Sequence, residues 1–196
     1  CKKLGNFNGW LAFSVFSFYN ARIVNLLLRH MKDKQRNFKI LLGGNGCSSS
    51  LAEFDNKEFG HYCLDNKLCD YVIFGEGEVA LNELLKGNDT YPGINKSNFQ
   101  QITNLDLLEF PDYKGIDWSA YVDPRLMITG SRGCVRKCTF CDIELSWPKF
   151  RYRSAENIVE EIKKNFYETG ITQFEFTDSL INGSISNFDK FNKLLI

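Results

Sequence analysis

Three cysteines are the residues of this sequence whose type and spacing most directly suggest chemistry. Cys134, Cys138 and Cys141 are separated by four and three positions in a stretch that begins after a glycine. Thiolates at this spacing can converge on one metal centre while the backbone wraps around it. Three protein ligands leave one position open, so an iron of a four-iron cluster could take a substrate or cofactor as its fourth ligand. We therefore predict a metal centre on these cysteines.

Two alternatives to an iron–sulfur centre remain at this point. Structural zinc sites use four ligands, commonly as two separated pairs, and no fourth Cys or His lies near the triplet. The two histidines, His30 and His61, fall in a different part of the chain. A coincidental triplet is the second alternative, which we expect in roughly one chain in a hundred of this cysteine content.

The elements around the cysteines follow the pattern of a βαβ unit. Residues 126–129 are predicted to form a strand, the cysteine loop follows, and a helix begins at Ser154 and ends at Gly170. Acidic residues in its first half and lysines in its second complement the helix dipole. Residues 171–176 form the next predicted strand. The face expected to be buried consists of Ile158, Val159, Ile162 and Phe166.

The N-terminal half alternates short apolar runs with helical patterns. The runs at residues 11–18, 38–42 and 71–74 are predicted strands, and residues 21–32 and the segment after Glu78 are predicted helices. Strands that are apolar on both faces and alternate with helices indicate a parallel sheet covered on both sides. The first of these helices carries Ile23, Leu26, Leu27 and Met31 at helical spacing.

The whole chain is therefore predicted to be α/β, with three parts. We expect a first domain over residues 1–90, an ordered connector over residues 91–123 and a second domain over residues 124–196. The apolar pattern that continues to Ile196 reads as an unfinished helix, and we expect the chain to be a fragment of a longer protein.

The composition limits the classes of binding partner and the cellular compartment that we expect for this chain. The 24 basic and 24 acidic residues give a formal charge of zero, and there is no long basic run, so no nucleic-acid partner is predicted. No apolar stretch has the length of a membrane span, and no signal peptide is recognisable. We expect the seven cysteines to lie in the reducing cytoplasm.

The cysteine segment resembles the radical S-adenosylmethionine superfamily, in particular its cobalamin-binding-domain branch. The resemblance comprises Gly-Ser-Arg-Gly at 130–133, the three cysteines, and Arg-Tyr-Arg-Ser-Ala-Glu-Asn-Ile-Val-Glu-Glu-Ile at 151–162. It implies a partial Rossmann-like parallel sheet of the cobalamin-binding type, followed by the first βαβ unit of a (β/α) radical S-adenosylmethionine barrel. In this family, three such cysteines hold a [4Fe-4S] cluster whose unique iron binds S-adenosylmethionine, which is reductively cleaved to a 5'-deoxyadenosyl radical.

The resemblance also implies residues that contact S-adenosylmethionine. Phe140, the aromatic residue before the third cysteine, would pack near the adenine. Asp178 follows the second predicted strand, where the family carries an acid near the methionyl amino group or ribose, often with a second acid where this chain has Ser179. The alternative for Asp178 is a cap on the next helix, near Asn182.

A cobalamin site is implied at three predicted strand ends of the first domain. The matching residues are Ser14, Gly43, Gly44, Gly75, Glu76 and Gly77. Glycines at the carboxyl ends of parallel strands let a bulky ligand approach the backbone. The alternative is that the glycines only form tight turns. Cys47, Cys63 and Cys69 are not spaced with the cluster set and are predicted to be buried as small apolar residues.

These observations favour a radical S-adenosylmethionine enzyme, a methyltransferase or cyclase by its family. It would act on a small molecule or peptide, with an electron donor such as flavodoxin or ferredoxin. The alternatives are a non-catalytic iron–sulfur or electron-transfer module, and an inactive truncated fragment. Residues 124–196 are far fewer than the about 200 of an eight-unit barrel, so we expect this chain alone to be inactive.

Overall fold

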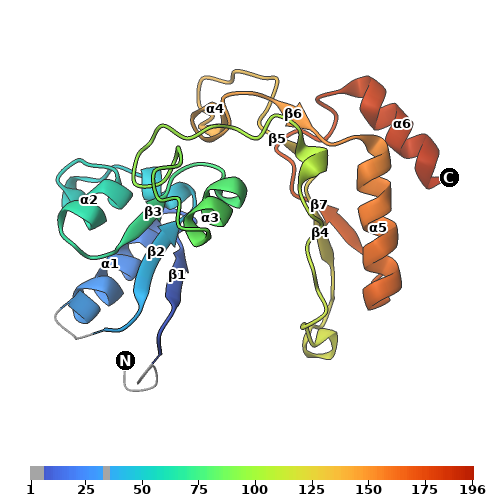
Figure 1. Ribbon diagram of the computed structural model, residues 1–196. Helices are drawn as coiled ribbons and strands as arrows, with labels where there is room; N and C mark the ends of the chain where they lie inside the picture. Colours follow the sequence, from blue (N-terminus) through green and yellow to red (C-terminus); the bar gives the residue numbers. More distant parts are fainter. Residues whose placement is uncertain (1–6, 33–35) are drawn as a thin grey trace. The chain divides into compact units, whose positions relative to one another are not determined.

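The computed structural model describes residues 7–32 and 36–196, apart from the side chain of Leu145, and Cys1 lies outside these residues. The chain forms two compact units, one ending at Gln101 and the other beginning at Ile102. This division falls inside the segment predicted as a connector. Helices alternate with parallel strand pairs in both units, so the predicted α/β class is confirmed (Figure 1).

The first unit contains a three-stranded parallel sheet in the order β1-β2-β3. Its strands are β1 (Trp10–Ser14), β2 (Lys39–Gly43) and β3 (Tyr71–Ile73). The register pairs Ser14 with Gly43, and Gly43 with Ile73. The carboxyl ends of all three strands therefore lie at one edge of the sheet.

Helices cover both faces of this sheet. Helices α1 (Phe18–Lys32) and α2 (Phe59–Asp65) pack on one face, and α3 (Gly77–Leu85) packs on the other (Figure 1). Two short 3₁₀ turns, Asn45–Ser48 and Ala52–Phe54, connect β2 to α2. The arrangement agrees with the sequence prediction, because strands with helices on both sides must be apolar on both faces.

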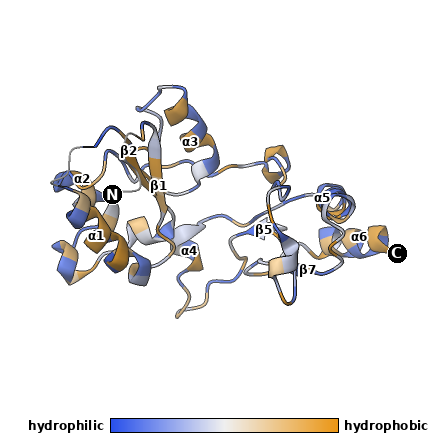
Figure 2. Ribbon diagram, turned by 90° about the horizontal axis from the view of Figure 1, so that it is seen from below, coloured by the Kyte–Doolittle hydropathy of each residue, from blue (hydrophilic) through white to orange (hydrophobic). Residues whose placement is uncertain are grey.

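Helix α1 is present as predicted, but most of the apolar residues whose spacing indicated it do not face the sheet. The residues that face the sheet are Ala21, Val24, Leu28 and Met31, whereas Ile23 and Leu26 are 60% and 69% exposed. Hydrophobic and hydrophilic stretches alternate along α1 in Figure 2, and the helix carries apolar residues on two sides. Hydrophobicity alone could not choose between these sides. Ala21 is fully buried on the side that packs against the sheet.

The second unit is built on a parallel pair of strands. Strand β4 (Leu126–Ile128) pairs with β7 (Phe174–Phe176), and helix α5 (Ala155–Thr169) lies between them in the chain. The predicted βαβ order is thus confirmed. Helices α5 and α6 (Ile185–Leu195) share one hydrophobic core with this pair. The segment before β4 contains only the 3₁₀ turns Leu105–Leu107 and Trp118–Ala120.

The ends of α5 are those that the sequence predicts, and two of the four residues predicted for its buried face, Ile158 and Val159, are buried. The Ser154 hydroxyl accepts a hydrogen bond from the Asn157 amide at 3.2 Å, and Gly170 ends the helix with a positive φ. Phe166, predicted to be buried, is 42% exposed. Glu161 and Asn165 are buried in its place. A buried carboxylate on this face requires a partner, which is Arg153.

Among the described residues, no helix combines the length and the apolar character that a membrane span requires.

Candidate functional site

The cysteine loop is closed at its base by a short antiparallel ladder. Strands β5 (Ser131–Arg132) and β6 (Arg151–Tyr152) pair Ser131 with Tyr152 and Arg132 with Arg151. The loop between them carries all three cysteines and one helical turn, α4 (Ile143–Ser146). The sequence analysis did not predict this ladder. It holds the two ends of the loop together directly after β4 and before α5.

The three predicted thiols lie in the open part of this loop. Cys134 is partly buried, whereas Cys138 and Cys141 are exposed. The Cys141 amide donates to the Cys138 carbonyl at 3.0 Å, which forms a turn between the second and third cysteines. The Arg136 amide donates to the Cys134 sulfur at 3.3 Å. A backbone donor aimed at sulfur stabilises negative charge on it, as a metal-ligating thiolate requires.

The three thiols of the loop suit an iron–sulfur cluster by type, although their sulfur atoms do not lie together around one point. Within the described ranges, no three His, Cys, Asp or Glu side chains are close enough together to hold a metal ion. Three thiols form a soft donor set, which suits iron–sulfur clusters. The exposure of Cys138 and Cys141 leaves them accessible for cluster assembly.

Asp178 lies at the carboxyl end of β7, beside the start of the cysteine loop. Its carboxylate accepts hydrogen bonds from the Gly130 amide at 2.9 Å and from the Ser131 hydroxyl. A Cβ on Gly130 would lie 3.3 Å from the Asp178 carboxylate, so the absence of a side chain permits this close contact. Asp178 therefore joins the ends of β4 and β7. These two bonds do not cap α6, which was the alternative role considered for Asp178.

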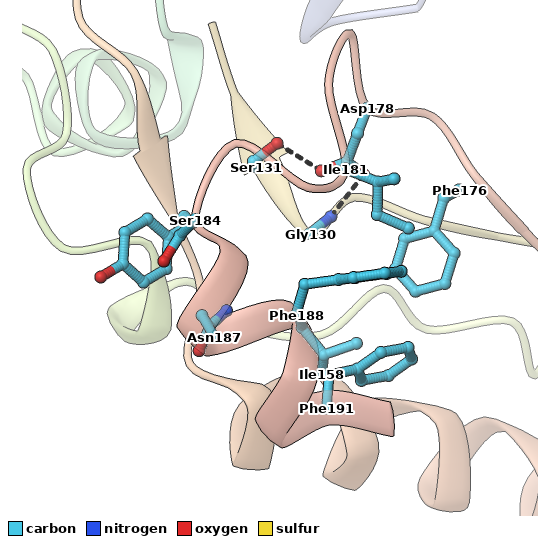
Figure 3. Close-up of a pocket in the computed structure, with 11 residues that line it drawn as sticks. Gly130, Ser131, Ile158, Phe176, Asp178, Ile181, Ser184, Asn187, Phe188 and Phe191 are labelled. Carbon is cyan, nitrogen blue, oxygen red and sulfur yellow. Dashed lines mark hydrogen bonds between the residues drawn. The ribbon is translucent and has the colours of Figure 1, made fainter. Parts of the chain in front are cut away.

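A small cavity lies beside Asp178, between the two strand ends and the amino-terminal part of α6 (Figure 3). The rings of Phe176, Phe188 and Phe191 form its apolar side, and Asp178 and Asn187 contribute polar groups. Its volume is about 20 Å³, which holds a water-sized group and not a nucleoside. Phe140, the residue predicted to contact adenine, is 90% exposed and does not line this cavity.

The residues predicted to bind cobalamin gather at one edge of the first unit. Ser14 and Gly43 end β1 and β2, and Gly75 to Gly77 follow β3. Ser14 is exposed, whereas Glu76, which precedes α3, is buried. Because parallel strands β1, β2 and β3 are adjacent, the three loops share the crevice position that open α/β sheets use for ligands.

The glycines at this edge of the sheet differ in whether the fold itself requires a residue without a side chain. Gly44 has φ +104° and a Cβ there would lie 2.6 Å from the Val15 carbonyl oxygen. Gly75 has φ +74° and a Cβ would lie 2.2 Å from the Phe99 ring. The fold itself therefore requires glycine at both positions. At Gly43 the nearest atom would be 4.0 Å away, so the fold leaves room for a side chain or for a ligand.

Cys47, Cys63 and Cys69 are buried in the first unit, which confirms the role predicted for them. Burial raises the pKa of Cys47 to about 12. A hydrogen bond with Cys69, together with burial, raises the pKa of Cys63 above its ordinary value. Both thiols are therefore protonated at neutral pH, which makes them poor metal ligands and poor nucleophiles.

Sequence reasoning missed a buried ion pair beneath the cysteine loop. Arg153 and Glu161 are 8% and 1% exposed and contact each other directly. Arg153 also donates to the Thr129 carbonyl at 3.1 Å, and its amide donates to the Gly130 carbonyl at 2.8 Å. Arg153 thus fixes the end of β4 from which the loop departs. The arginine directly before the Ser154 helix cap was the signal that could have indicated this role.

Comparisons with known proteins agree with an enzyme related to methyl-transfer enzymes. No family model matches the chain, and no solved structure matches it significantly. An uncharacterized methyltransferase from Pyrococcus horikoshii is 31% identical over 129 residues, which cover 56% of this chain and 28% of the relative. A protein from Methanocaldococcus jannaschii, provisionally named a methylthiotransferase, is 28% identical over 204 residues, covering 92% of this chain and 42% of the relative.

A third relative is named an anaerobic magnesium-protoporphyrin IX monomethyl ester cyclase and comes from Cereibacter sphaeroides. It is 27% identical over 132 residues, which cover 56% of this chain and 21% of the relative. The chain thus spans less than half the length of each of these relatives. Their names all denote enzymes, which supports an enzyme at this coarse level.

Proposed function

We propose that this chain carries the cluster-binding part of a radical S-adenosylmethionine enzyme. The observation that carries the proposal is the placement of the three thiols in one loop that starts at the carboxyl end of β4, next to Asp178. Ligand sites in barrels of parallel strands lie at this end of the strands. The names of the relatives, which include methyl transfer and anaerobic ring formation, agree with the same chemistry.

Cys134, Cys138 and Cys141 would hold a [4Fe-4S] cluster through their thiolates, with the Arg136 amide supporting the charge on Cys134. Such a cluster supplies one electron to S-adenosylmethionine, whose sulfur–carbon bond then breaks to give methionine and a 5'-deoxyadenosyl radical. Asp178 would orient the cofactor through its contacts with the ends of β4 and β7, and Phe140 would pack against the adenine. The electron would come from a donor protein such as flavodoxin or ferredoxin, and we place the enzyme in the cytoplasm.

The first unit would bind cobalamin at the carboxyl edge of its sheet. Support comes from the side-by-side ends of β1, β2 and β3 and from the room at Gly43. Cobalamin would serve as a methyl carrier in a methyltransferase, while the substrate would be a small molecule or a peptide. Cobalamin titration followed by its visible absorbance tests this part. Gly43→Leu should abolish the spectral change without unfolding the chain, and unaltered binding in this variant would contradict the site.

The experiment that tests the cluster is anaerobic reconstitution of the chain with iron and sulfide. We expect about four irons per chain. We also expect an electron paramagnetic resonance signal of the reduced protein that changes when S-adenosylmethionine is added. Alanine at any of Cys134, Cys138 or Cys141 should remove the cluster, whereas Cys47→Ala is the matched control and should retain it. Equal iron in all four variants, or zinc in place of iron, would refute the assignment. A cluster whose signal ignores S-adenosylmethionine would favour an electron-transfer module.

A further inference from the structure

The ring of Trp147 lies close to two arginines at the base of the cysteine loop. The Arg132 and Arg151 guanidinium carbons lie 5.4 and 5.8 Å from the indole centroid. The two arginines are directly opposed partners in the β5–β6 ladder, where like charges repel each other. Because an aromatic face attracts a cation, the indole contributes a favourable contact to both arginines.

The side chain of Arg151 is held in place by burial and by hydrogen bonds. It is 8% exposed, and its guanidinium donates to the Ile102 carbonyl at 2.6 Å and to the Lys149 carbonyl at 3.3 Å. Trp147 is thus held against a side chain that packing and hydrogen bonds hold in place. We name the set of Arg132, Trp147 and Arg151 the loop clamp.

The loop clamp is connected to the segments that carry Cys134 and Cys141, the first and the last cysteine of the loop. The Trp147 amide donates to the Ile143 carbonyl at 2.8 Å and closes α4, which begins two residues after Cys141. On the other side, Gly133 precedes Cys134 and packs against the backbone of the Trp147 segment. A Cβ on Gly133 would lie 3.1 Å from the Trp147 carbonyl oxygen, so the two chain segments touch there.

We infer that Trp147 is a positioning residue for the cysteine loop. By joining β5, β6 and the end of α4, it fixes the separation between the segments that lead into Cys134 and out of Cys141. The thiols can then reach one cluster without first ordering the whole loop. This inference rests on the proposed function. The effect of Trp147 on the order of the loop can be measured without a cluster.

The metal-free test uses trypsin, because Arg136 and Lys137 lie inside the loop and are exposed. Trp147→Leu keeps an apolar side chain but removes the aromatic face, and Trp147→Phe retains a face. Cleavage after Arg136 and Lys137, measured by mass spectrometry relative to cleavage after the exposed Lys96, should rise about tenfold in Trp147→Leu. It should rise much less in Trp147→Phe. Trp118→Leu, a matched change in the same unit, should leave the rate unaltered.

A Trp147→Leu rate within twofold of the unsubstituted chain, or an equal rise in Trp118→Leu, would overturn the clamp. The second measurement concerns the reconstituted protein. Trp147→Leu should contain less than about half of the iron and give a broadened resonance signal, and Trp147→Phe should restore both. Unchanged iron and an unchanged signal in Trp147→Leu overturn the positioning role. If the unsubstituted chain takes up no iron, the proposed function fails, and the trypsin result alone decides on the clamp.

Discussion

Removing the carboxylate of Glu161 should destabilise the second unit by about 3 kcal/mol. Glu161 is 1% exposed, and its partner Arg153 is 8% exposed, so Glu161→Leu leaves a guanidinium without its counter-charge in the core. Breaking a buried pair in this way costs about 3–5 kcal/mol. The lower value applies because Arg153 keeps its bonds to the Asn157 side chain at 2.7 Å and to the Thr129 carbonyl at 3.1 Å.

The matched variant replaces both partners. Arg153→Met combined with Glu161→Leu removes both buried charges and fills the same volume with apolar groups, which is often close to neutral. The loss of the Arg153 bonds to the Thr129 carbonyl and the Asn157 side chain should still cost about 2 kcal/mol in total. The double variant should therefore recover about 1 kcal/mol relative to Glu161→Leu alone.

Urea unfolding followed by tryptophan fluorescence measures both variants. Trp10→Phe leaves Trp118 and Trp147 as the emitters, and both belong to the unit that begins at Ile102. With a slope of about 1.5 kcal/mol per molar urea, a loss of 3 kcal/mol lowers the midpoint by about 2 M. A loss below about 1 kcal/mol in Glu161→Leu would show that the pair is not buried in solution. A double variant as unstable as the single one would show that the uncompensated charge is not the cause.

Three further predictions concern other parts of the chain. Asp178→Ala should cost about 2 kcal/mol in urea unfolding, because the Gly130 amide loses its charged acceptor; a loss within error would refute the strand-joining role. Gly75→Ala should cost about 2 kcal/mol from its positive φ and its overlap with Phe99, whereas Gly43→Ala should stay within about 0.5 kcal/mol, and equal losses would contradict this difference. Between about pH 9 and 12, stability should fall by about 1.4 kcal/mol per pH unit for Cys47, since the unfolded thiol ionises while the folded one does not. Thermal unfolding across this range should show a smaller slope in Cys47→Ala, and an equal slope would contradict the raised pKa.

Regular elements with strong local signals could be predicted from the sequence. Ser154 and Gly170 define α5 because a hydroxyl cap and a left-handed glycine act within one turn of the chain. Strands β2 and β3 end at Gly43 and Ile73, and the positive-φ glycines Gly44 and Gly75 that follow them are equally local signals. The buried side of α1 did not follow, because both of its sides are apolar and the choice depends on packing against residues distant in sequence.

Contacts between segments distant in sequence could not be predicted. The β5–β6 ladder has two residues in each strand, which is too short to give an alternating pattern. The burial of Glu161 has no local signal in the sequence, since a carboxylate is buried only where a partner such as Arg153 is available. Asp178 was singled out by position alone, and its bonds to Gly130 and Ser131 emerged from the strand pairing.

The cysteine loop is held at its base and exposed in its middle. Its base is held by the ladder, the loop clamp and the Arg153 bonds to the end of β4, whereas Cys138 and Cys141 lie in the exposed part. If the whole loop were ordered, preformed thiols would repel one another once ionised and would obstruct insertion of a cluster. If the whole loop were free, closing it would cost conformational entropy at the moment of binding. Under the proposed function, a fixed base with open thiols would reduce this entropic cost and keep the ligands accessible to a cluster that assembles after folding.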